Sequence, residues 1–209
     1  MLKHNAATLP VVQQSLMETI TYLKQLGLDD TLLPRLEALM SQLLSMAHHD
    51  QLTGALNRES LIEHIDAELK RAQRTRQGFC VAVIGIDQLP EIMAQHGSQE
   101  VKRILQWVAK DAIQVLRALD SFGRIGAAEF AIVMPCTWPI QGKSAIMRLK
   151  NQLQQLDSCT AQAVSELSFS TGLTCNLVGE NADALLARAI LALEQARQSG
   201  LDQIVELEA

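Results

Sequence analysis

The run from Ser121 to Met134 constrains the fold of this chain more than any other stretch, because it has the pattern of a β-hairpin. Residues 121–125 and 130–134 are β-prone, and they flank a turn of small residues followed by the acidic Glu129. Small residues and glycine suit a tight turn between two strands. Strands joined in this way are antiparallel, so we expect a sheet that contains antiparallel pairs.

Helical and strand-like segments alternate around this hairpin. The continuous apolar, β-prone run Phe79–Ile86 is typical of a strand buried on both faces. Gly97 is expected to end a short helix, and Ser98 to cap the long amphipathic helix that follows. We expect helices over 58–76, 89–96, 98–116, 143–156 and 182–198, and strands over 79–86, 121–125, 130–134, 167–177 and 203–207. The alternation predicts an α/β fold with helices around a sheet.

Residues 1–48 are predicted to be a helical segment, separate from a domain over 49–209. Apolar side chains recur there at helical spacing in two stretches, interrupted by Gly27. Two short amphipathic helices cannot bury their apolar stripes alone, so they need a partner surface. That surface is either the chain's own domain or a second copy of the chain. We favour self-association as a homodimer, with the helices dimerising and transmitting a signal.

Composition excludes several classes of function. The chain has 18 Lys and Arg against 23 Asp and Glu, a formal net charge of -5, which argues against a nucleic-acid partner. It has neither an apolar signal core nor an apolar run that could cross a bilayer, so we expect a cytoplasmic protein without membrane association. The cysteines have no metal-ligand spacing and are expected to be reduced, mostly buried thiols. They are Cys80, Cys136, Cys159 and Cys175.

Several motifs in this order resemble the GGDEF domain of diguanylate cyclases. The hairpin turn Gly126-Ala127-Ala128-Glu129-Phe130 is similar to the family's Gly-Gly-Asp/Glu-Glu-Phe. The opening run 50–58 resembles D-x-L-T-G-L-x-N-R, in which Asn57 can cap a helix and Asp50 can pair with Arg58. Residues 85–87 resemble D-x-D, 168–172 resemble S-x-G, and 192–200 resemble A-L-Y-x-A-K-x-x-G. The resemblance covers roughly 49–207 and implies a central five-stranded mixed or antiparallel sheet surrounded by helices.

The resemblance also implies that the metal-binding positions of the family are changed. The family holds GTP with a divalent metal, whose carboxylate ligands come from the first Asp of D-x-D and the first acid of the turn. Those positions are Gly85 and Ala128 here. Asp87 and Glu129 remain, matching the second acid of each motif, but neither replaces a missing ligand. Ala127 puts a methyl group where a glycine lets the backbone approach a phosphate. We therefore expect no metal and no cofactor.

The positions that read guanine in the family are changed as well. By the resemblance, Met93 stands in place of an Asn and Lys102 in place of an Asp. A thioether and an ammonium group cannot reproduce the donors and acceptors of those side chains. Together with the metal positions, this predicts a degenerate domain that is not an enzyme.

A second site of the family is retained. Arg117 and Asp120 have the R-x-x-D spacing and the placement of the inhibitory site, which binds cyclic di-GMP. A guanidinium can grip a guanine edge or a phosphate, and a carboxylate can accept hydrogen bonds from guanine. Arg148, on the next helix, could add a phosphate contact. The alternative for the pair is a local ion pair or helix cap, and for Arg148 a solvated helix face.

Three functions remain open at this point. The first is a non-catalytic receptor for cyclic di-GMP that passes its state to a protein partner or to the N-terminal helices. The second is a dimerisation or protein-interaction module that has no need of nucleotide. The third is a weak enzyme with another nucleotide or metal arrangement.

Overall fold

The computed structural model describes residues 47–160 and 167–207, without the side chains of 155–160, and eight residues between 18 and 39. The chain divides into two compact units, Met1–His49 and Asp50–Ala209. The helices and the self-association predicted for residues 1–48 therefore lie largely outside the described residues. None of the described helices is long and apolar enough to cross a membrane.

The second unit alternates helices and strands nearly as the sequence predicts. Its helices are α3 (Arg58–Thr75), α4 (Leu89–Val115), α5 (Pro139–Thr160) and α6 (Ala182–Gln198). Its strands are β1 (Phe79–Ile86), β2 (Ser121–Arg124), β3 (Glu129–Pro135), β4 (Phe169–Cys175) and β5 (Ile204–Leu207). Asn57 caps α3 by accepting a hydrogen bond from the Ser60 N–H at 2.9 Å. Gly97, with φ 79°, interrupts α4 where the sequence predicts a break.

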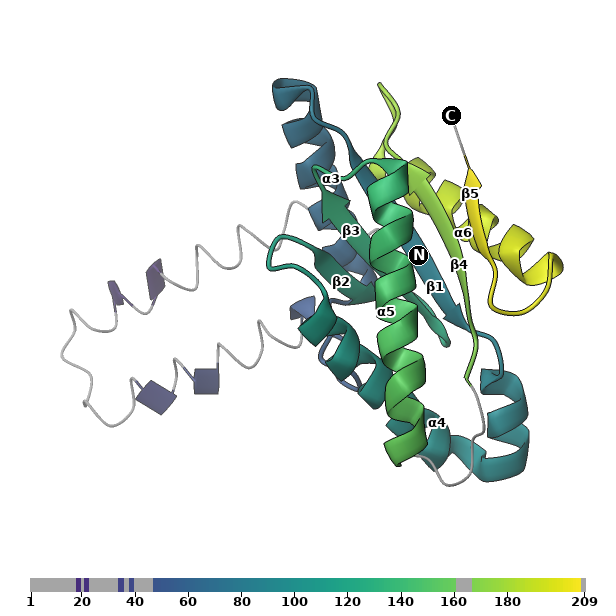
Figure 1. Cartoon of the computed structure of the whole chain (residues 1–209). Helices are drawn as coiled ribbons and strands as arrows, with labels where there is room; N and C mark the ends of the chain where they lie inside the picture. Colours follow the sequence, from purple (N-terminus) through teal and green to yellow (C-terminus); the bar gives the residue numbers. More distant parts are fainter. Residues whose placement is uncertain are drawn as a thin grey trace, which may run out of the picture. The chain divides into compact units, whose positions relative to one another are not determined.

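The strands form one five-stranded sheet in the order β2-β3-β1-β4-β5 (Figure 1). β1 is central and antiparallel to both of its neighbours, β3 and β4. The predicted hairpin is confirmed, since β2 and β3 pair antiparallel around the 125–128 turn. β5 adds to β4 in parallel. The predicted α/β fold with a five-stranded mixed sheet surrounded by helices is confirmed.

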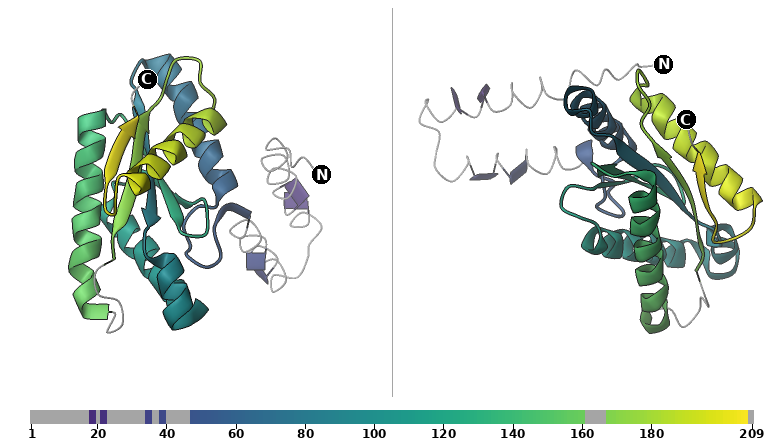
Figure 2. Two further views of the ribbon diagram at one scale, coloured as in Figure 1. Left: turned by 90° about the vertical axis from the view of Figure 1, so that its right-hand side faces the viewer. Right: turned by 45° about the horizontal axis from the view of Figure 1, so that its top comes forward.

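Side chains of β1 alternate between two apolar layers. Cys80, Ala82, Ile84 and Ile86 pack in the layer formed with α4 and α5. Phe79, Val81 and Val83 pack in the layer formed with α3 and α6. Figure 2 (left) shows α5 on one side of the sheet and α3 and α6 on the other. This period of two decides which helices each residue of the strand can meet.

The cysteine prediction is wrong for one pair. Cys80 and Cys175 are joined by a disulfide, across the β1–β4 ladder where they are direct partners with Cα atoms 4.0 Å apart. Cys136 is a free, exposed cysteine. The two bonded residues are 95 positions apart. Their pairing depends on the strand register, which cysteine spacing along the chain does not reveal.

Gly172 allows α6 to pack directly on the sheet. It lies opposite Val83 of β1, on the face that α6 covers. A Cβ atom there would meet the backbone of α6 at Ala189, Ala192 and Leu193, lying only 2.7 Å from the carbonyl carbon of Ala192. Backbone atoms of a packed helix cannot move aside as a flexible side chain can.

We therefore expect Gly172→Ala to destabilise the domain by about 1–3 kcal/mol or more, through overpacking. Thermal unfolding followed by circular dichroism measures this. Gly142→Ala in α5 is the matched control, because a Cβ there meets only side-chain atoms, the nearest at 3.3 Å. Equal unfolding midpoints for the two variants would contradict the interpretation.

Candidate functional site

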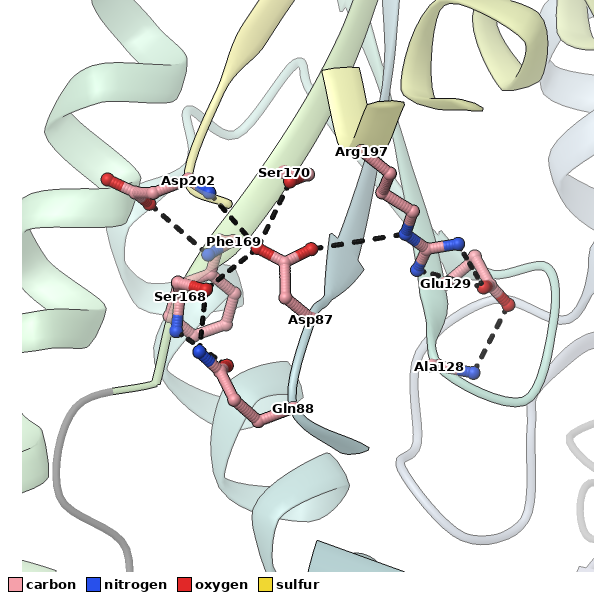
Figure 3. A network of polar contacts seen from close by, with 9 residues as sticks. All are labelled: Asp87, Gln88, Ala128, Glu129, Ser168, Phe169, Ser170, Arg197 and Asp202. Carbon is pink, nitrogen blue, oxygen red and sulfur yellow. Dashed lines mark hydrogen bonds and ion pairs between the residues drawn. The ribbon is translucent and has the colours of Figure 1, made fainter. Parts of the chain in front are cut away.

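One row of residues crosses three strands at the end of β1 and faces α6. Gly85 is paired with Glu129 of β3 on one side and with Ser170 of β4 on the other. Because side chains alternate along a strand, Asp87 points to the same face as Gly85, two residues earlier. Figure 3 shows Asp87 and Glu129 on either side of Arg197, which comes from the end of α6.

Asp87 is a buried carboxylate with unequal oxygens. Its side chain is 1% exposed. Its Oδ2 accepts hydrogen bonds from the hydroxyls of Ser168 at 2.8 Å and Ser170 at 3.0 Å, and from the backbone N–H of Asp202 at 3.2 Å. Its Oδ1 is buried and has no hydrogen-bond partner among the described residues. The nearest cationic atom to Oδ1 is Arg197 Nε, at 3.9 Å.

Arg197 joins the two acids of this site. Its Nη1 and Nη2 both donate to Glu129 Oε1, each at 3.2 Å. Its guanidinium also lies over Gly85, since a Cβ atom there would be 2.9 Å from Arg197 Cζ and 3.2 Å from its Nε. The absence of a side chain at Gly85 is therefore what leaves room for the guanidinium.

A second layer of contacts fixes the surroundings of Asp87. Gln88 donates from Nε2 to the Ser168 hydroxyl at 2.8 Å and accepts from the Ser168 N–H at 2.9 Å. Asp202 accepts at Oδ1 from the Phe169 N–H at 3.2 Å. The buried Lys150 of α5 binds the same carboxylate oxygen at 2.8 Å and donates to the Asp202 carbonyl at 2.7 Å. These contacts hold the 168–170 segment and the loop before β5 against β1.

Arg124 holds the hairpin turn in place through hydrogen bonds to the backbone of the turn. Arg124 donates from Nε to the Gly126 carbonyl at 3.1 Å and from Nη2 to the Ala127 carbonyl at 3.0 Å. Its Nη1 also lies 3.3 Å from Asp50 Oδ1. Asp50 thus pairs with Arg124, whereas the sequence suggested Arg58. The contact ties the opening run of the domain to the hairpin.

Glu129 and Ala128 point to different faces. Glu129 folds back so that its carboxylate lies where a Cβ of Gly126 would stand, and its Oε2 accepts from the Ala128 N–H at 3.2 Å. Ala128 packs against the layer formed with α4 and α5. Gly126 therefore has a packing role here, because a side chain there would displace the Glu129 carboxylate.

The positions predicted to have lost guanine recognition, Met93 and Lys102, both lie on α4 and are exposed. They are on opposite sides of the Gly97 break. No described contact joins either of them to Asp87, Glu129 or Arg197.

Arg117 and Asp120 lie in the short connection between α4 and β2. The Arg117 N–H donates to Asp120 Oδ2 at 2.9 Å, and the Asp120 N–H donates to the Arg117 carbonyl at 2.9 Å. Arg117 is exposed, and its guanidinium has no ion-pair or hydrogen-bond partner within the described ranges. Arg148 is exposed on α5, beside Met147 and Asn151. No described contact brings Arg148 to the other two residues.

A family model for the GGDEF domain, described as diguanylate cyclase, matches residues 47–203 of the chain. The chain belongs to the GGDEF domain family. Among curated relatives, the diguanylate cyclase DgcP of Pseudomonas aeruginosa is 28% identical over 187 residues, which cover 81% of this chain and 28% of DgcP. An uncharacterised signalling protein of Caulobacter vibrioides is 30% identical over 74% of this chain and 19% of its own length. The chain thus spans less than a third of either relative.

Solved structures share the fold. The diguanylate cyclase SiaD of Pseudomonas aeruginosa, in complex with its activator SiaC, matches with a TM-score of 0.74 and 26% identity over 94% of this chain and 78% of SiaD. The coiled coil and GGDEF domain of DgcB from Caulobacter crescentus, in complex with c-di-GMP, matches with a TM-score of 0.77 over 90% of this chain and all of that one. Its identity of 20% supports the fold alone.

Sequence reasoning missed the residue that organises this GGDEF site. Arg197 is part of the 192–200 motif, at the position of the family's Lys, but nothing in the pattern indicates that it contacts Glu129. Ser170 belongs to the S-x-G motif, and its role as a donor to Asp87 follows only from strand register. The period of two along β1, which places Gly85 and Asp87 on one face, was the available signal.

The contact between Asp50 and the hairpin predicts a pH dependence of stability. Burial raises the pKa of Asp50, but hydrogen bonds from Thr53 and the charge of Arg124 outweigh it and lower the pKa below 3.8. A carboxyl group with a lowered pKa in the folded state stabilises the fold at pH values above its unfolded pKa. That contribution is lost as the pH falls through the folded value.

We expect Asp50→Asn to lower the free energy of unfolding by about 1–2 kcal/mol at neutral pH. The difference from wild type should shrink as the pH falls below 3.8, the ordinary pKa of Asp, and disappear once the pH is below the folded value. Urea unfolding at a series of pH values measures it. Asp66→Asn, at an exposed position of α3, is the control. A deficit of Asp50→Asn that persists unchanged at low pH would contradict the assignment.

Proposed function

We propose that this chain is a GGDEF-family signalling module that does not cyclise GTP and that binds cyclic di-GMP through Arg117 and Asp120. The observation that best supports the loss of catalysis is the occupation of the site by Arg197. Its guanidinium lies between Asp87 and Glu129 and above Gly85, where the family pattern has a carboxylate.

The contacts around Asp87 and Glu129 argue against catalysis. A divalent metal needs several oxygen ligands at short distance. Among the described residues, no group of three or more His, Cys, Asp or Glu side chains could hold a metal ion. Gly85 and Ala128 offer no side-chain oxygen, and both neighbouring carboxylates already contact Arg197. The residues present therefore do not fit the metal that the family's reaction requires.

The geometry of the 117–120 turn supports a receptor role. Mutual hydrogen bonds between the two residues set the turn, so its backbone does not need to be ordered when a ligand binds. The exposed guanidinium of Arg117 remains available for a guanine edge or a phosphate. Asp120 keeps Oδ1 for guanine N–H groups, since the described hydrogen bond uses only Oδ2. Arg148 is proposed as an additional phosphate contact.

The relatives support the choice of ligand and of partner class. A microbial GGDEF domain that is 29% identical to this chain, with a TM-score of 0.67, is described as interacting with cyclic di-GMP, and SiaD is described as bound to its activator protein SiaC. By analogy we propose cyclic di-GMP as the ligand of this chain and a protein as its signalling partner. The homodimer and the cytoplasmic location expected from the sequence stay predictions.

The second candidate is a protein-interaction module that binds no nucleotide. The observation in its favour is the Arg117 N–H to Asp120 Oδ2 hydrogen bond, which ends a helix locally and explains the carboxylate without any ligand. Under this alternative, Arg117→Ala and Asp120→Ala leave self-association unchanged and no cyclic di-GMP binds.

Isothermal titration with cyclic di-GMP tests the receptor role. We expect binding to the wild type, and a loss of about 10- to 100-fold in affinity for Arg117→Ala and for Asp120→Ala, because each removes a charge-assisted contact. Arg103→Ala is the matched control, since Arg103 is an exposed arginine of α4 that pairs with Glu100. Absence of binding at high ligand concentration would refute the receptor role.

Incubation with GTP and Mg²⁺ or Mn²⁺, followed by chromatography, tests the loss of catalysis. We expect no cyclic di-GMP, because the site has neither the carboxylates nor the guanine-reading side chains of the family. Detectable product would establish the weak enzyme as the correct function instead.

A further inference from the structure

We propose that the guanidinium of Arg197 takes the place of a divalent metal ion in this site. It is a permanent positive charge that balances the carboxylates of Asp87 and Glu129, as a bound metal ion would in a metal-dependent domain. The inference deepens the proposed loss of catalysis and rests on it in part. The role of Arg197 in charge balance and stability can be measured by thermal unfolding, without nucleotide.

The buried carboxylate of Asp87 needs a positive charge beside it. Asp87 is 1% exposed, and its Oδ1 has no hydrogen-bond partner in the part of the chain that the structure describes. A carboxylate removed from water needs donors on both oxygens or a nearby positive charge. Three donors satisfy Oδ2, which leaves Oδ1 facing the guanidinium at 3.9 Å (Figure 3).

The guanidinium of Arg197 bridges the two carboxylates of the site. Arg197 Nη1 and Nη2 contact Glu129 on β3, and its Nε faces Asp87 after β1. One planar group with several donors can bridge two carboxylates in this way, whereas an ammonium is a compact point charge. The family pattern has Lys at this position, so the arginine supplies a bridge that the family's lysine would not.

The position of the Arg197 guanidinium depends on the absence of a side chain at Gly85. Any side chain at residue 85 would start within the volume of the guanidinium, since Arg197 Cζ lies 2.9 Å from the point where a Cβ atom would stand. The guanidinium is the far end of a flexible side chain, so it could swing away, but only by giving up Glu129 and Asp87. A glycine at 85 and an arginine at 197 thus belong to one arrangement.

A double-mutant cycle tests this dependence. Gly85→Ala and Arg197→Ala should each lower the thermal midpoint by a few degrees, and the double variant by about as much as one of them, because either change removes the same ion pairs. Arg103→Ala is the matched control, since it removes an exposed pair on α4 and should combine additively with Gly85→Ala. Additive effects for Gly85→Ala and Arg197→Ala would overturn the proposal.

Metal titration supplies the second readout. The wild-type midpoint should not respond to millimolar Mg²⁺, Mn²⁺ or EDTA, because the cation is part of the chain. Arg197→Lys should recover only part of the midpoint that Arg197→Ala loses, because a single ammonium group cannot bridge Asp87 and Glu129 as the planar guanidinium does. A response of the wild type to Mn²⁺ or EDTA, or full recovery of the midpoint by Arg197→Lys, would refute the substitution. Failure of the proposed function would appear separately, as GTP turnover or absent cyclic di-GMP binding.

Discussion

Burial of β1 on both faces, between two antiparallel neighbours, is the constraint on which the rest of the domain depends. Because its side chains alternate strictly, every residue of the strand is committed to one of two helix layers. A shift of one residue would carry Gly85 and Asp87 to the side of α4 and α5 and would put Ile84 and Ile86 under α6. The register of β1 thus decides which helix can reach Gly85 and Asp87, and that helix is α6.

The alternation of side chains along β1 also explains why Asp87 is buried and needs partners that balance its charge. Asp87 is carried inward by the same register that buries the strand, so its charge must be balanced by neighbours rather than by water. Serine hydroxyls, a backbone N–H and the guanidinium of Arg197 supply the balance. The Asp202 carboxylate, in the loop before β5, forms an ion pair with Lys150 and accepts a hydrogen bond from the Phe169 N–H. Removal of one member of such a network costs more than the pair itself contributes, because an uncompensated charge stays behind.

The fold could be predicted from the sequence because its determinants are local or periodic. The continuous run of β1, the small-residue turn of the hairpin and the Asn57 cap each act within a few residues. The site depends on the register between segments that are distant in the chain, and the sequence alone could not predict which of their residues meet. The Cys80–Cys175 disulfide, the Asp50–Arg124 pair and the reach of Arg197 to Glu129 all join residues more than 60 positions apart. Motifs indicated that these residues matter, but only the sheet shows which of them meet.

Edge strand β2 connects the proposed ligand-binding turn, residues 117–120, to the opening run of the domain, residues 50–58. The turn of Arg117 and Asp120 leads directly into it, and it pairs with Leu56 through the Leu56 N–H to Phe122 carbonyl and Arg124 N–H to Leu56 carbonyl bonds at 3.0 and 2.7 Å. Arg124, its last residue, then contacts Asp50. A displacement of β2 caused at the turn would therefore have to break or carry along the opening run of the domain. Energetic coupling is carried by packed side chains, hydrogen-bond networks and rigid elements that have two discrete arrangements, and β2 supplies the hydrogen-bonded link between the turn and the opening run.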